Sequence, residues 1–334
     1  IPGQQRVTTE SSRGLDQRLL ARFHDVAGGA YRGRIIGAAL LVVVASVGVT
    51  SAGAGAAADN SLIAPKPSTL SIVNKAPNAA TTGVPSGTSL RIHKGDLVVR
   101  KAGAVVSGLE VRGRVIISAP NVTVRNTSIR GGKKPRFGIG LLTIVSKRAR
   151  DFVVEDVTIR PRKVSPNFDA VKVNRRGVLR RLNISGTVDG VLVYGSGVRI
   201  ESSYLHDFRH FRFNPNQRGG SHDDSIQVVA GSGIRIVGNT LMGARNAAVM
   251  VTQDVGPTND LQINDNWIDN GACSVNFGSG GPYQSGIQVN NNRFGRAQIV
   301  ADCAIIRRAR SSDLRPVGNV WDADDAPVSV SRGS

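Results

Sequence analysis

After residue 88, short runs of alternating apolar and polar residues return along the chain at a regular interval. Each run has the order apolar, any, apolar, any, a small residue or Asn/Asp, two further residues and an apolar one. Alternation at period two predicts a strand, and the Gly, Asn or Asp that follows predicts a turn. The runs recur about every 27 residues and begin at Ala104, Val122, Phe152, Val178, Val198, Ile234, Leu261, Ile287 and Leu314. No stretch after residue 88 has a sustained helical period.

A second column of short strands lies upstream of most repeats. Its members are DAVKV from Asp169, DGVLV from Asp189, DSIQV from Asp224, AAVMV from Ala247, CSVNF from Cys273 and CAII from Cys303. Two or three strands per irregular repeat are typical of a coil of a parallel β-solenoid. We therefore predict an all-β protein, a parallel β-helix of about nine coils. An antiparallel sandwich is the alternative, but it explains the recurring Asn/Asp position poorly, because Asn ladders need parallel, in-register stacking.

The first 88 residues differ in character from the repeats. Residues 35–49 are apolar, follow two arginines and precede small residues up to Ala58, so 35–58 is predicted to be a signal peptide or, if uncleaved, a membrane anchor. Residues 1–34 form a polar stretch that we expect to be disordered, and 59–88 resemble a linker in composition. The β-helix is expected to span 89–325, with a tail at 326–334. The protein is therefore expected to be secreted or to face the outside of the cell.

Charge narrows the choice of partners. The chain has 43 Lys and Arg against 24 Asp and Glu, and residues 91–181 alone hold 22 basic and 6 acidic residues. Such a field favours a polyanion. Nucleic acid is not expected, because no set of stacking aromatics accompanies the basic residues and export argues against it. Five basic clusters that recur once per coil are predicted to form a stripe: Lys133-Lys134-Arg136, Lys147-Arg148-Arg150, Arg160-Arg162-Lys163, Arg175-Arg176 and Arg180-Arg181.

The two cysteines test the predicted register. Cys273 and Cys303 occupy the same position in successive coils of the second column. Neighbouring strands lie about 4.8 Å apart, within the separation that a disulfide accepts. We predict a disulfide, with two free, stacked and buried thiols as the alternative.

Three aspartates lie in the same column. Asp169, Asp189 and Asp224 each begin one of three consecutive strands, so the register places their backbones about 4.8 Å apart in turn. Three carboxylates so close require either a bound cation or a strongly raised pKa for at least one of them. The alternative is that each aspartate caps the turn before its strand through a local bond to the backbone.

The longest coil, from Val198 to Ile234, carries the excursion SSYLHDFRHFRFNPNQRGG before SHDDSIQV. A loop on a rigid solenoid is an expected place for a site. Candidate substrate-binding residues are Arg209, His210 and Arg212 in this loop together with Tyr194 and Gln227 on neighbouring strands. A zinc site of His206, His210 and His222 is a weaker alternative, because no H-x-x-x-H on a helix is present.

Several segments carry a family resemblance. They are GVPSGTSLRIHKGDLVVRKAGAVVSGLEVRG, VIISAPNVTVRNTSIRGG, SYLHDF, SHDDSIQVVAGSGIRIVGNTL and NNNRFGRA. Over roughly residues 83–325 the sequence resembles the secreted right-handed parallel β-helix proteins of actinobacteria, within the pectate-lyase-like superfamily. The resemblance implies a right-handed helix, but it does not choose among lyases, hydrolases, epimerases and binding proteins.

The resemblance implies aspartates and a basic residue on one face, the arrangement of a polysaccharide lyase. In that hypothesis Asp169, Asp189, Asp223 and Asp224 hold Ca²⁺, and no organic cofactor is needed. Lys172, with a pKa lowered by desolvation, would accept the proton in a metal-assisted β-elimination of an acidic, uronate-containing polysaccharide. Asp224 and His222 complete the candidate catalytic residues. The alternative for Lys172 is a solvated strand lysine.

Two other functions remain open. A hydrolase resembling the polygalacturonases would use Asp189 and the pair Asp223-Asp224, but the coil after them reads NAAVMV, without that family's His-Gly, and its later Arg-x-Lys is absent too. A non-catalytic surface protein would bind anionic glycan with its basic face. In each case we expect a monomer that contacts a membrane only through 35–58, if that segment is uncleaved.

Overall fold

The computed structural model describes residues 76–333, except 133–137, 139, 216, 279–281 and 309–311. This part of the chain contains strands, turns and bends and no helix, hence none that could cross a membrane. Parallel pairing joins strands of successive coils throughout both sheets, as the repeat predicts, so the parallel β-helix is confirmed. The predicted segments 1–34 and 35–58 lie outside the described residues.

One wall of the solenoid is a ten-stranded parallel sheet built from the second column of predicted strands. Its strands, in spatial order, are β2 (Leu97–Val99), β4 (Val115–Ile117), β6 (Gly140–Ile144), β8 (Asp169–Val173), β11 (Val191–Val193), β14 (Asp224–Val228), β17 (Ala247–Val251), β20 (Val275–Phe277), β23 (Ile305–Arg308) and β25 (Val330–Gly333). Ten rungs are one more than the nine coils expected, because β25 lies in the predicted tail and pairs with β23.

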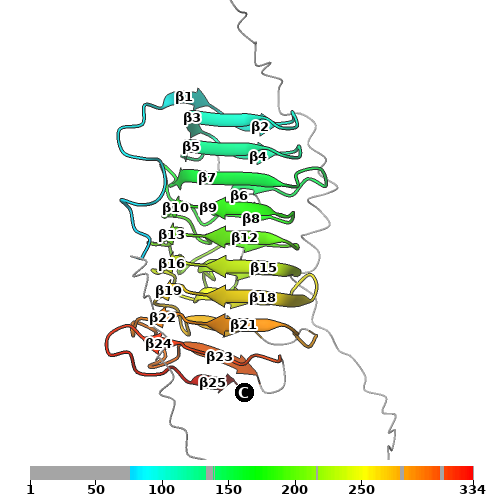
Figure 1. Cartoon of the computed structure of the whole chain (residues 1–334). Helices are drawn as coiled ribbons and strands as arrows, with labels where there is room; N and C mark the ends of the chain where they lie inside the picture. Colours follow the sequence, from blue (N-terminus) through cyan, green and yellow to red (C-terminus); the bar gives the residue numbers. More distant parts are fainter. Residues whose placement is uncertain are drawn as a thin grey trace, which may run out of the picture. The chain divides into compact units, whose positions relative to one another are not determined.

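The repeats themselves form a fifteen-stranded sheet that bends around the other side (Figure 1). One arm contains β1 (Arg91–Lys94), β3 (Val105–Arg112), β5 (Thr123–Ile129), β7 (Phe152–Ile159), β9 (Gly177–Arg180), β12 (Val198–Glu201), β15 (Gly231–Val237), β18 (Thr258–Asn264) and β21 (Ile287–Asn290). The other contains β10 (Asn183–Ile184), β13 (Tyr204–Leu205), β16 (Thr240–Leu241), β19 (Trp267–Ile268), β22 (Arg293–Phe294) and β24 (Val320–Trp321). The arms meet at β7, whose first half pairs with β9 and whose second half pairs with β10.

The bend between the arms explains the recurring small or Asn/Asp position. The residue there adopts a positive φ in coil after coil, for example 65° at Gly238, 58° at Asp265 and 55° at Asn291. Gly, Asn and Asp tolerate this left-handed conformation best. The chain turns there, and the apolar residues on both sides can point into one core.

The next residue of the repeat forms a polar stack that we call the asparagine ladder: Asn239, Asn266, Asn292 and Asn319. The amide nitrogens of the first three donate to the amide oxygen of the following coil, at 3.0, 3.0 and 2.9 Å along the stack. All four are buried. The ladder confirms the parallel, in-register stacking on which the prediction of a β-helix rather than an antiparallel sandwich was based.

The interior is filled by stacked Val, Ile and Leu side chains, with Phe152, Phe277 and Phe294 as the largest fully buried residues. The end of the predicted linker also contacts this body. Thr82 is buried, the N–H of Gly83 donates to the Arg181 carbonyl at 2.8 Å, and the N–H of Val84 donates to the Thr158 hydroxyl at 3.0 Å. Residues 76–88 are therefore packed along the bend, while 59–75 lie outside the described residues.

Candidate functional site

The ten-stranded sheet places the three aspartates in one column. Val171 pairs with Val191, and Val191 with Ile226, so the residues two positions before them, Asp169, Asp189 and Asp224, occupy adjacent rungs. We call these three the aspartate column. Further along the same column Cys273 and Cys303 form the predicted disulfide, with a Cα–Cα distance of 4.7 Å. The register drawn from the sequence is therefore correct from Asp169 to Cys303.

An irregularity at the start of β8 directs Asp169 to the outside of the sheet. The consecutive N–H groups of Ala170 and Val171 both donate to the next coil, at 2.9 and 2.8 Å. In a regular strand successive N–H groups point to opposite sides, so the alternation of side chains is interrupted here. Asp169 thereby reaches Lys172, and its carboxylate lies 2.9 Å from the lysine Nζ.

Lys172 is the cation of this site, and the role expected for it must be corrected. Burial lowers the pKa of Lys172, but the negative charge of Asp169, with Tyr194 and Asp189 nearby, outweighs burial and raises that pKa above its ordinary value. The side chain is therefore protonated at neutral pH. It cannot accept a proton as the predicted general base, and it is not a solvated strand lysine either, because only 12% of its side chain is exposed.

Asp189 is buried and keeps its proton more tightly than a normal carboxyl group. Its pKa is raised by burial first, and then by the charges of Asp169 and Asp224. Its Oδ1 accepts the backbone N–H of Asp224 at 2.9 Å. The bond runs between coils rather than within the local turn, so Asp189 ties one rung to the next.

Asp224 titrates near neutrality. Burial raises its pKa to about 7, against hydrogen bonds from the Asn246 side chain and the Ala247 N–H and with the charge of Asp223 acting in the same direction as burial. The Asn246 amide donates to Asp224 Oδ1 at 2.8 Å. Of the two outcomes expected for a stack of carboxylates, the raised pKa is present at Asp189 and Asp224, and Lys172 in addition pairs with Asp169.

The carboxylates do not fit the predicted calcium site as they stand. Asp169 is paired with Lys172, and Asp189 and Asp224 accept hydrogen bonds from the protein itself. Among the described residues no three His, Cys, Asp or Glu side chains come together as metal ligands. Calcium binding prefers six to eight oxygen ligands, which this column does not offer.

Asp223 and His210 form a pair that connects the long loop to the sheet edge. His210 Nδ1 lies 2.7 Å from Asp223 Oδ1, and the backbone N–H of Arg245 donates to Asp223 Oδ2 at 2.7 Å. The Asp223 side chain is 1% exposed, whereas the imidazole is 34% exposed. Because a carboxylate only accepts, Nδ1 carries the proton, and in the neutral ring Nε2 keeps its lone pair. The pair thus orients an accessible proton acceptor.

The other two histidines of this region have other hydrogen-bond partners. His206 stacks on Tyr204, with ring centroids 3.9 Å apart, and contacts Asp207 and Asn183 through its two nitrogens. His222 is exposed, and its backbone N–H donates to Gln217. The described residues therefore form no three-histidine zinc site.

The candidate substrate-binding residues fall into two groups. Gln227 lies in the same row of the sheet as Lys172, with Leu192 between them, and Tyr194 lies beside Lys172 with a pKa raised chiefly by burial. Arg209 and Arg212 are exposed on the long loop. The structure thus places one group over the aspartate column and the other beside His210.

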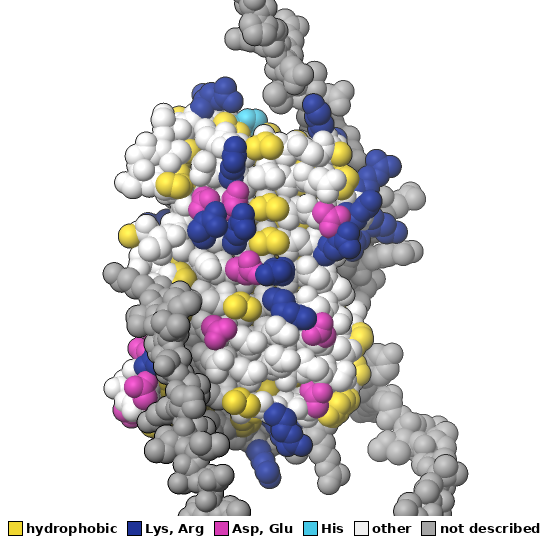
Figure 2. Space-filling model, viewed as in Figure 1, with side chains coloured by type: hydrophobic (Ala, Val, Ile, Leu, Met, Phe, Trp, Pro, Cys, Tyr) yellow, Lys and Arg dark blue, Asp and Glu magenta, His cyan; other side chains and the backbone are white. Residues whose placement is uncertain are grey.

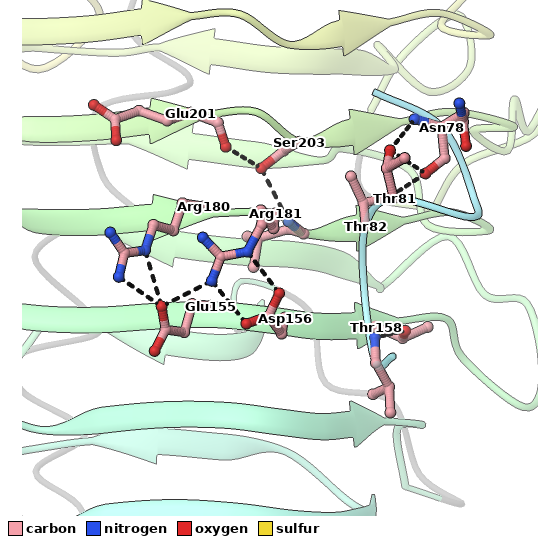
Figure 3. Close-up of polar contacts among 12 residues, drawn as sticks. Asn78, Thr81, Thr82, Glu155, Asp156, Thr158, Arg180, Arg181, Glu201 and Ser203 are labelled. Carbon is pink, nitrogen blue, oxygen red and sulfur yellow. Dashed lines mark hydrogen bonds and ion pairs between the residues drawn. The ribbon is translucent and has the colours of Figure 1, made fainter. Parts of the chain in front are cut away.

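The predicted basic stripe is partly neutralised by ion pairs. On the face in Figure 2, basic side chains lie next to acidic ones. Figure 3 shows Arg180 and Arg181 reaching back one coil to Glu155 and Asp156, with nitrogen–oxygen distances of 2.7–3.0 Å. Arg176 similarly pairs with Asp151. These arginines join neighbouring coils rather than forming a free stripe, and the cluster 133–136 lies outside the described residues.

The sequence analysis did not identify the pairing of His210 with Asp223, or the hydrogen bond from the Arg245 backbone N–H to the same carboxylate. The sequence predicts a substrate contact for His210 and a metal contact for Asp223, because twelve residues of loop separate them and no periodic pattern relates them. The His-Asp-Asp cluster at 222–224 is the available signal for this site, but it does not indicate that His210 is the histidine in contact with Asp223.

Comparison with known proteins supports the fold and leaves the reaction open. No curated protein matches the sequence. Residues 143–319, more than half of the chain, match the family model described as "Right handed beta helix region", and this range includes the aspartate column, the His210–Asp223 pair and the asparagine ladder. The β-helix is a fold common among carbohydrate-active enzymes. The chain belongs to the right-handed β-helix family.

Proposed function

We propose that this chain is an extracellular, carbohydrate-active protein that cleaves an acidic, uronate-containing polysaccharide by β-elimination, with His210 as the proton-transferring residue. The observation that carries the proposal is the 2.7 Å contact between the accessible His210 imidazole and the buried Asp223 carboxylate. Asp223 binds Nδ1, so Nε2 is the ring nitrogen left for the substrate. The disulfide is in keeping with an oxidising compartment.

The reaction balances without a metal. The neutral Nε2 of His210 takes the proton from the carbon next to the uronate carboxylate. The bond from the neighbouring carbon to the glycosidic oxygen breaks, a carbon–carbon double bond forms, and the imidazolium returns the proton to the departing oxygen. General base catalysis of this kind contributes about 10²–10⁴-fold.

The carbon acid must also be activated by a positive charge on the uronate carboxylate. Arg245 is exposed, and its backbone is anchored to the same Asp223 carboxylate that holds His210. We assign this role to its exposed guanidinium, because an arginine suits a planar carboxylate. Lys172 stabilises the aspartate column and takes no part in the proton transfer.

The test compares His210 with His222, the histidine that precedes Asp223 in the sequence. His210→Gln is expected to lower the cleavage rate at least about 100-fold, whereas His222→Gln, the matched control on an exposed site, keeps it. Polygalacturonate and alginate serve as substrates, with and without calcium and with chelator. Ultraviolet absorbance of the unsaturated uronate reports elimination, and new reducing ends without it report hydrolysis.

Three results would contradict the proposal: hydrolysis products alone, loss of activity in His222→Gln but not in His210→Gln, or activity that disappears with chelator. The last would restore the calcium mechanism expected from the sequence.

A non-catalytic role is the second candidate, and one observation favours it. Asp189 and Asp223 accept backbone N–H groups from Asp224 and Arg245, a structural use that requires no reaction. This candidate predicts binding of polyuronide with no product from any substrate of the panel.

A further inference from the structure

The long loop carries an aromatic side chain that the protein itself does not bury. Phe213 is 86% exposed, whereas Phe208 at the base of the same loop is 7% exposed. The three largest core phenylalanines are almost fully buried. Exposing a phenyl ring forfeits about 2 kcal/mol of burial free energy, so its position on the surface needs a reason.

The loop that holds Phe213 is an ordered projection, which we call the hairpin arm (residues 206–215 and 217–222). The N–H of Phe211 donates to the Ser221 hydroxyl at 2.7 Å, and the N–H of Ser221 donates to the Phe211 carbonyl at 2.9 Å. Nearer the tip, the Asn214 amide donates to Gln217 at 2.9 Å. Hydrogen bonds thus join the two sides of the loop around Phe213, whose side chain stays exposed.

The arm is fixed to the solenoid beside the proposed reaction centre. The N–H of Arg209 donates to the Thr187 carbonyl at 2.7 Å. Phe208 packs on Gly190, where an added Cβ would lie 2.9 Å from its Cζ. His210 and Phe213 are therefore three residues apart in one loop segment whose base is anchored to the solenoid.

Charge around Phe213 indicates what it contacts. The Arg212 guanidinium lies 5.8 Å from the centre of the Phe213 ring. Arg209, Arg212 and Arg218 are all exposed on the arm, and none of them forms an ion pair within the described part of the chain. Arg180 and Arg181, in contrast, are paired with Glu155 and Asp156. The arm therefore combines an open apolar ring with unneutralised cations.

We infer that the hairpin arm is a binding subsite for an acidic polysaccharide, in which Phe213 stacks on the C–H face of a sugar ring and Arg212 binds a carboxylate. A uronate unit has both features, an apolar ring face and an anionic group. The inference rests on the proposed function, because it extends the same bound chain from His210 along the arm. A nucleic acid also combines stacking with negative charge, but the disulfide and the fold favour an extracellular glycan.

The experiment measures binding separately from cleavage. Affinity for polygalacturonate and alginate is measured by calorimetry in the non-cleaving His210→Gln background, and dextran and a thymidine oligonucleotide are the neutral and nucleic-acid probes. Phe213→Ala is expected to weaken polyuronide binding about tenfold, as for one well-placed aromatic contact. Arg212→Ala is expected to weaken it less and to reduce its salt dependence. Tyr283→Ala and Arg332→Ala, at exposed positions outside both the arm and the predicted basic stripe, are the controls.

The outcomes separate the subsite from the reaction. Polyuronide binding that needs Phe213, without product from the native protein, supports the subsite and overturns the proposed cleavage. Cleavage and binding that are unchanged in a folded Phe213→Ala variant overturn the subsite alone. Failure to bind either polyuronide, or tighter Phe213-dependent binding of the oligonucleotide, also overturns it.

Discussion

The asparagine ladder and the aspartate column are two polar stacks in one solenoid, and they solve the same problem in different ways. Each asparagine amide both donates and accepts, so Asn239, Asn266, Asn292 and Asn319 satisfy one another along the stack. A carboxylate only accepts. The aspartate column therefore needs donors from elsewhere.

Those donors come from three sources. Lys172 supplies a cation to Asp169, the Asp224 N–H supplies a bond to Asp189, and the Asn246 amide supplies one to Asp224, while the pKa values of Asp189 and Asp224 are raised. The comparison teaches that a neutral ladder stabilises the fold at any pH, whereas a carboxylate stack depends on its cation and on its protons. The following predictions test this difference.

Removal of the cation should have the largest effect. Lys172→Met leaves Asp169 without its partner in a site that is mostly buried, and breaking such a pair costs about 3–5 kcal/mol. Denaturant unfolding should show a correspondingly lower free energy of unfolding. Asp169→Asn together with Lys172→Met should recover part of the loss, and Lys147→Met, at an exposed lysine, should change little. An unchanged stability in Lys172→Met would mean that the column does not depend on its cation.

A break in the asparagine ladder should cost somewhat less. Asn266→Ala removes an amide that donates to Asn292 and to the Ile236 carbonyl, and it leaves buried groups unsatisfied, at about 3 kcal/mol in total. The loss should be the same at all pH values near neutrality, because no charge is involved. Asn276→Ala, on strand β20 and half-buried, is the control. A loss that varied strongly with pH would contradict the distinction between the two stacks.

The smallest effect is the dependence of stability on pH that Asp224 contributes. Its pKa is about 7 when folded and 3.8 ordinarily, so the folded state binds the proton more tightly. The stabilisation is complete below the unfolded pKa and is lost as pH rises toward 7. Between pH 5 and pH 7 this amounts to about 2 kcal/mol. Asp224→Asn should flatten that part of the curve, measured as the denaturant midpoint against pH, and an equally steep decline in the variant would contradict the assignment.

The sequence was sufficient to predict the column but not the chemistry inside it. Stacking like residues one coil apart requires only the repeat, so the alignment of Asp169, Asp189 and Asp224, and the disulfide between Cys273 and Cys303, followed from it. The pKa of Lys172 depends on the balance between burial and neighbouring charges. That balance is a difference of two large opposing effects. The sequence analysis expects burial to prevail and to lower the pKa, whereas the charge of Asp169 prevails and raises it.

The sequence by itself determined the solenoid, because alternation at period two and a turn residue at each bend are local properties that repeat. Only the tertiary structure decided which groups meet across the loop: His210 with Asp223, and Arg245 with the same carboxylate. The physical reason is that an irregular loop has no period to relate its residues, so its contacts are set by where its anchored base and the neighbouring coils bring it.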